Sequence, residues 1–66
     1  MIYKVKVLYK DGHVKHTSTY KFWKKKHAIN ALTRWSYKLK PPYYIHVYRV
    51  NYNGYTKHVV SEHGVI

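Results

Sequence analysis

Six histidines and thirteen lysines or arginines are the side chains of this 66-residue chain that could do chemistry. Histidine is the commonest metal ligand and a general acid or base near neutral pH. His13 and His16 are three residues apart on an expected strand, so they point to opposite faces and cannot chelate together. A zinc site needs at least three protein ligands, and without cysteine the only further donors are two carboxylates. We therefore expect no metal and no cofactor.

Catalysis faces the same shortage of acidic groups. Asp11 is needed by a turn, which leaves Glu62 without a second carboxylate for glycosidase or two-metal chemistry. A metal-free ribonuclease that works with histidine and lysine alone is a lesser alternative. We expect a non-enzymatic protein with no catalytic residues. The histidines that such a ribonuclease would use are His13, His16, His46 and His58.

The charge balance indicates a polyanionic partner. Thirteen basic side chains stand against two acidic ones, which gives a formal net charge of +11 at pH 7. Such a charge attracts polyanions, and the repulsion among the cations destabilises a compact folded state. The chain should nevertheless fold, because 45% of its residues are hydrophobic and 18% are aromatic, unlike a disordered tail. Its length suits one small domain without a large enzyme cleft.

Other features concern the cellular setting. Without cysteine there is no disulfide framework, which fits a reducing compartment. We see no signal peptide after Met1, and no stretch approaches the ~20 apolar residues of a membrane span. We expect a cytoplasmic protein without membrane contact. The cysteine-free composition, rich in Lys, Tyr and Asn, is similar to that of small bacteriophage or mobile-element proteins.

The first element that could position the lysines is a β-hairpin over residues 2–21. Apolar and lysine residues alternate there with a period of two. The dipeptide Asp11-Gly12 predicts a two-residue type I′ turn with Lys10 facing His13. One face would then hold Tyr3, Val5, Val7, Tyr9, Val14, His16, Ser18 and Tyr20, and the other Ile2, Lys4, Lys6, Leu8, Lys10, His13, Lys15, Thr17, Thr19 and Lys21.

A helix is expected next, over about residues 23–39, before Pro41-Pro42 ends it. No good N-cap residue is visible near Trp23, which we expect to pack in the core or at its rim. Cations in the first turn oppose the helix dipole, but they favour an incoming phosphate. Lys24, Lys25 and Lys26 are therefore candidate binding residues. The apolar stripe is Ala28, Ala31, Leu32, Trp35 and Leu39, and we expect Val5, Val7, Ala28, Leu32 and Trp35 to be buried together.

A second hairpin is expected over residues 43–62, with a turn of the same kind at Asn53-Gly54 and Tyr48 facing Val59. Superposing the two hairpins at their turns favours one set of residues of the second hairpin as its inward face. The alternative set, on the opposite face, is nearly as apolar. The favoured inward face is Ile45, Val47, Arg49, Thr56, His58 and Val60, and the rival is Tyr44, Tyr48, Val50, Tyr55 and Val59.

These elements predict an α+β fold of order β-β-α-β-β, a four-stranded antiparallel sheet with one helix packed on one face. Residues 1–62 would form a single basic domain and residues 63–66 a short C-terminal tail.

The sheet face away from the helix would combine cations with exposed aromatic rings. Lysines neutralise phosphates, and tyrosine rings stack on bases. We therefore expect a partner of nucleic acid, either DNA or RNA. The alternatives are a phage or mobile-element protein that binds and inhibits an acidic host protein, a homodimer through the tyrosine-rich face, and a plain solvated face. The candidate nucleic-acid-binding residues are Lys4, Lys6, Lys10, Lys15, Lys21, Lys24, Lys25, Lys26, Tyr44, Tyr48, Tyr52, Tyr55 and Lys57.

Overall fold

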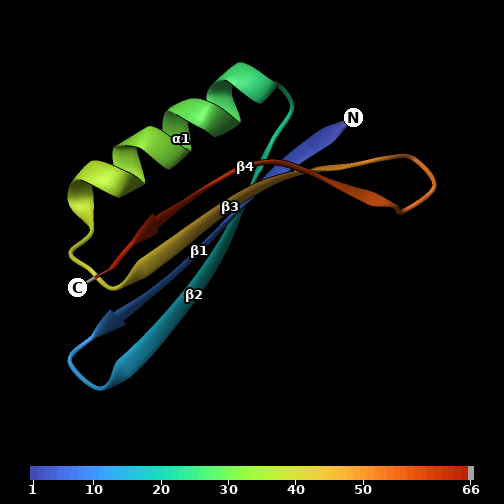
Figure 1. Ribbon diagram of the computed structural model, residues 1–66. Helices are drawn as coiled ribbons and strands as arrows, with labels where there is room; N and C mark the ends of the chain where they lie inside the picture. Colours follow the sequence, from blue (N-terminus) through green and yellow to red (C-terminus); the bar gives the residue numbers. More distant parts are fainter. Residues whose placement is uncertain (66) are drawn as a thin grey trace.

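Two antiparallel hairpins joined by a helix make up the computed structural model, which describes residues 1–65 (Figure 1). The strands pair in the order β2-β1-β3-β4, and every neighbouring pair is antiparallel. The expected α+β fold with one sheet and one helix is confirmed. The elements are β1 (Ile2–Asp11), β2 (Val14–Phe22), α1 (Lys25–Lys38), β3 (Tyr43–Val50) and β4 (Thr56–Gly64).

The helix α1 lies across one face of the sheet and contacts all four strands (Figure 1). Since β1 is antiparallel to both β2 and β3, the chain leaves β2, passes over β1 as α1 and returns as β3 parallel to β2. The two hairpin turns therefore lie at opposite ends of the sheet, and within residues 1–65 no helix covers the other sheet face (Figure 1).

The core lies between α1 and the two central strands. Val5 pairs with Val47 and Val7 with Ile45, and all four side chains are fully buried. Ala28 and Leu32 cover them from the helix. Burying one such aliphatic side chain stabilises the fold by about 1.5–3 kcal/mol.

The two tryptophans have different environments. Trp35 packs against the core, with its ring 6.3 Å from Tyr9 and 5.8 Å from Tyr20 between centroids, but it is only half-buried. Its predicted contact with the core is confirmed, whereas its predicted burial is not. Trp23 lies before α1 rather than in it and is 79% exposed. The expectation that Trp23 packs in the core or at its rim is therefore wrong, because the helix begins two residues later than predicted.

The β1–β2 turn differs from its prediction by two residues. Asp11 pairs with Val14, so the central turn residues are Gly12 and His13. Gly12 has a φ of 63° and no other residue in this turn has a positive φ, which is the requirement of a type II′ turn. Lys10 consequently pairs with Lys15 rather than with His13. The shift is an even number of residues, so every predicted side-chain orientation in β1 and β2 survives.

The β3–β4 turn is longer than predicted. The Asn51 and Tyr55 backbones are joined by a hydrogen bond of 2.8 Å, which leaves a three-residue loop of Tyr52, Asn53 and Gly54. Gly54, with a φ of 87°, occupies the left-handed position of that loop, and a residue with a Cβ would be strained there.

A β-bulge changes the pairing of β3 and β4. Val47 pairs with Val60, but Tyr48 pairs with His58 rather than with the predicted Val59, so Val59 is the extra residue. Thr56 and His58 therefore lie on the face away from α1, and Lys57 lies on the helix side. The predicted placements of these three residues are wrong for this reason.

β4 is longer than predicted. It continues through His63 and Gly64, which were expected to belong to the C-terminal tail, while residue 66 lies outside the described residues.

Candidate functional site

The sheet face that α1 leaves uncovered, here called the outer face, has a cationic half on β1 and β2. Strand alternation and the cross-strand pairs bring the candidate lysines of these strands together on it. Lys4 pairs with Lys21, and Lys10 with Lys15. The lysines of this half are Lys4, Lys6, Lys10, Lys15 and Lys21.

The other half of the outer face, on β3 and β4, is aromatic. His46 lies at its centre, 5.2 Å from Tyr48, 4.9 Å from His58 and 6.0 Å from Tyr44 between ring centroids. His63 continues the cluster with an edge-on contact of 4.4 Å to Tyr44. Five rings thus form one connected aromatic cluster.

The two halves meet along the β1–β3 pairing. Lys4 lies opposite Tyr48 and Lys6 opposite His46, so each cation borders a ring. Neither acidic residue belongs to this face. Asp11 follows the helix-side alternation at the end of β1, and Glu62 pairs with the buried Ile45. Within residues 1–65 the outer face therefore carries no carboxylate to neutralise its cations.

The cationic surroundings of the outer face affect the protonation of His46. Desolvation is the main cause that lowers the pKa of His46 below its usual value, and the charges of His58 and Lys6 lower it further. Its Nε2 atom is also buried without a hydrogen-bond partner. His46 therefore favours its neutral form in the folded protein, and it contributes a flat ring rather than a charge.

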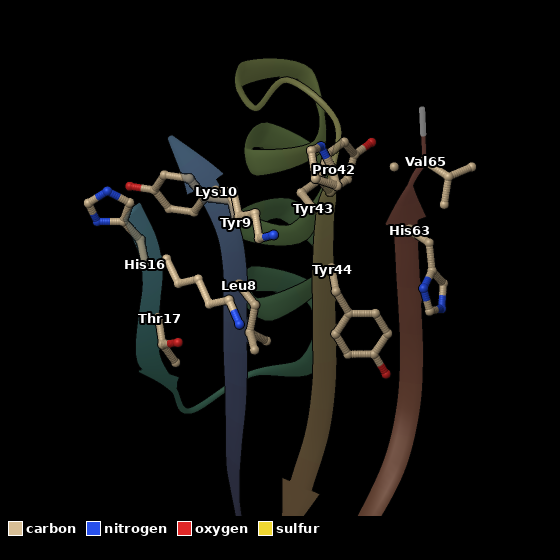
Figure 2. Close-up of a pocket in the computed structure, with 12 residues that line it drawn as sticks. Leu8, Tyr9, Lys10, His16, Thr17, Pro42, Tyr43, Tyr44, His63 and Val65 are labelled. Carbon is tan, nitrogen blue, oxygen red and sulfur yellow. The ribbon is translucent and has the colours of Figure 1, made fainter. Parts of the chain in front are cut away.

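A hollow of about 350 Å³ opens at the end of the sheet near the β1–β2 turn (Figure 2). Figure 2 shows Leu8 and Tyr44 beside each other on β1 and β3, with His63 on β4 beyond Tyr44. Lys10 and Lys15 also line it. The volume lies at the lower end of the range for small-molecule pockets, and the combination of rings, Leu8 and lysines suits a flat ligand with an attached anion.

The remaining candidate residues lie elsewhere. Tyr52 and Tyr55 belong to the β3–β4 turn, where they are 92% and 72% exposed, at the opposite end of the sheet from the hollow. Lys57 lies on the helix side, because the bulge reverses its orientation. The lysines at positions 24–26 precede and begin α1, also on the helix side.

The candidate list did not include three histidines of the outer face and Leu8. Strand alternation alone places His46, His63 and Leu8 there, but His46 was weighed as a histidine for metal binding or ribonuclease catalysis rather than for its ring. His58 could not be placed without the bulge.

Within residues 1–65, no group of three His, Cys, Asp or Glu side chains could hold a metal ion. In the same part of the chain, no helix has the length and apolar character needed to cross a membrane.

Comparisons with family models, curated proteins and solved structures gave no match to this chain. Its function must therefore be inferred from its own geometry and charge.

Proposed function

We propose that this chain is a small non-enzymatic protein that binds nucleic acid through its outer face. The observation that carries the proposal is the division of the outer face into a lysine half and an aromatic half that meet along β1 and β3, with no carboxylate on this face among residues 1–65. Lysines would neutralise backbone phosphates and release their counterions. The rings would stack on bases or contact sugars.

Single strands fit this surface better than a duplex interior does. Bases reach an aromatic ring only when they are unstacked, and Tyr44 and Tyr48 lie beside lysines that would hold the adjoining phosphates. The hollow beside Tyr44 would accept one base, with Lys10 and Lys15 near its phosphate. A duplex could still bind the lysine half through its backbone alone.

The test is a fluorescence-anisotropy titration of single- and double-stranded oligonucleotides across a salt series. The variant Lys4→Gln/Lys6→Gln/Lys15→Gln should weaken binding at ~100 mM salt by roughly 10²- to 10³-fold and flatten the log–log salt slope by up to ~3 units. The loss should be similar for all sequences, because phosphate contacts carry no sequence information.

A matched control separates the outer face from net charge. The variant Arg34→Gln/Lys38→Gln/Lys40→Gln removes the same charge from α1 and the segment after it, on the other side of the sheet. We expect it to weaken binding less than tenfold. If both triple variants lose the same affinity, the outer face has no special role and the proposal fails.

A second candidate function is a small protein that binds and inhibits an acidic host protein. It is favoured by the large aromatic side chains exposed near the two ends of α1, where Trp23 is 79% and Tyr37 is 87% exposed. Binding of this kind depends on a few aromatic residues at the centre of the interface. A partner whose affinity drops with Trp23→Ala, but not with the outer-face lysine variant, would favour this second function.

A further inference from the structure

A second group of cations surrounds a pocket of about 200 Å³ on the helix side of the sheet. Tyr3, Arg49 and Lys57 form one cross-strand row at its base, because Tyr3 pairs with Arg49 and Arg49 with Lys57. Lys25, the first residue of α1, and Val59 complete its lining with the neighbouring His58. Three cations from three separate elements thus meet at one pocket on the opposite side from the outer face.

The bulge at Val59 creates this arrangement. With regular pairing Lys57 would lie opposite Val50 and point away from α1. The extra residue instead places Lys57 opposite Arg49, beside the start of the helix. Two like charges directly opposite each other on a sheet are unfavourable, so this row is poorly suited to stability alone. An anion between the two cations would remove that repulsion.

Arg49 gives an independent reason to expect a ligand. Its Nε atom is buried and has no hydrogen-bond partner within residues 1–65, although a guanidinium is a planar donor that pairs well with phosphate or carboxylate oxygens. Glu62 pairs with Ile45, four residues away along β3, and Asp11 lies at the β1–β2 turn. Neither acid of the chain lines the pocket.

The start of α1 adds to the positive electrostatic potential at this pocket. No side chain caps the helix, its first turn contains no acid, and Lys24 occupies the N-cap. The partial positive charge of the helix N-terminus therefore adds to that of Lys25 rather than being neutralised.

We propose that this pocket binds a phosphate group, with Arg49 as the oriented donor and Lys25 and Lys57 as flanking charges. Phosphate matches the charge, the forked donor and the small volume. The phosphate could be the terminal group of a nucleic-acid strand or free inorganic phosphate. The site does not depend on the outer face, which lies on the other side of the sheet.

The experiment is an NMR titration of the ¹⁵N-labelled protein with inorganic phosphate at constant ionic strength, with chloride as the reference anion. We expect saturable shifts of the amides of Lys25, Lys57 and Val59. Lys57→Gln, a change at an exposed position of an edge strand, should weaken the apparent phosphate affinity about 5- to 10-fold. Lys38→Gln, at the other end of α1, should leave it unchanged. Equal affinity in Lys57→Gln and wild type, or shifts without saturation, would overturn the proposal.

A second arm identifies the source of the phosphate. A 5′-phosphorylated oligonucleotide is compared with the same strand lacking that phosphate, in wild type and in Lys57→Gln. Tighter binding of the phosphorylated strand that disappears in Lys57→Gln assigns the pocket to strand ends. Equal binding of both strands, with the inorganic phosphate shifts retained, assigns it to free phosphate. The triple lysine variant of the outer face should leave the inorganic phosphate titration unchanged, so failure of one proposal does not imply failure of the other.

Discussion

The two hairpins are built from similar sequence patterns and reach different geometries. β1 and β2 pair without interruption from Tyr3–Phe22 to Asp11–Val14 around a two-residue turn. β3 and β4 pair around a three-residue loop and change register at the Val59 bulge. The regular hairpin keeps its strand lysines on the outer face, whereas the bulged hairpin places His58 on the outer face and Lys57 on the other.

Packing of adjacent valines explains the bulge. Val59 and Val60 both pack against the core. Neighbouring residues of a regular strand point to opposite faces, so two consecutive side chains can point inward only if one of them is an extra residue. Burial of the second valine thus compensates for the disrupted pairing at the bulge.

The difference between the regular and the bulged hairpin separates the features of the fold that follow from local sequence from those that do not. Strand alternation, the helical stripe and the two glycine turns were enough to predict the element order, the sheet and the buried set Val5, Val7, Ala28 and Leu32. They also predicted which lysines of β1 and β2 share a face. The register could not be predicted, because Asp11-Gly12 and Asn53-Gly54 are each compatible with several turn lengths. The aromatic cluster and the phosphate pocket depend on that register.

A substitution in the core shared by both hairpins should have the largest effect on stability. Leu32 covers the buried valines from α1, so Leu32→Ala should lower the free energy of unfolding by about 2–5 kcal/mol. Urea denaturation followed by circular dichroism measures this change. The exposed helix position Thr33, with Thr33→Ala, is the control and should shift it by only about 0.5 kcal/mol. An unchanged unfolding midpoint in Leu32→Ala would contradict the assigned helix face.

The aromatic half of the bulged hairpin should affect single strands selectively. Tyr48→Ala removes one ring beside Lys4, and we expect it to weaken single-strand binding by about 1–3 kcal/mol with a smaller effect on duplex. Anisotropy titrations with both probes measure the difference. Tyr37→Ala, an exposed tyrosine of α1, should change neither affinity. Equal losses for both probes in Tyr48→Ala would mean that the ring does not stack on bases.

The two turns should respond alike to loss of glycine in spite of their different lengths. Gly12 and Gly54 have positive φ and open space where a Cβ would lie, so the backbone conformation alone is strained in Gly12→Ala or Gly54→Ala. Each change should destabilise the protein by about 1–2 kcal/mol. Asparagine should be tolerated better than alanine at Gly54, because asparagine can adopt the left-handed conformation. Thermal melts that show no loss in either alanine variant would contradict the turn assignment.

Acid should weaken the fold through the bulged hairpin. The lowered pKa of His46 means that the unfolded chain takes up this proton more readily than the folded one. The contribution of His46 is complete above about pH 6.5, declines as the pH falls below that value, and levels off below the lowered folded pKa. His58, Lys6 and the flanking Tyr44 and Tyr48 face this ring. Urea midpoints from pH 8 to 5 should therefore fall less in His46→Gln than in wild type. An equal decline in both proteins would assign the effect to other groups.

The most direct test of the outer face is whether the wild-type chain holds nucleic acid at all. An electrophoretic mobility assay should use single- and double-stranded probes over a salt series. We expect the single-stranded probe to be retained at ~100 mM salt, and the logarithm of the binding constant to fall linearly with the logarithm of the salt concentration. Failure to retain either probe at ~100 mM salt would contradict the proposed binding of nucleic acid by the outer face.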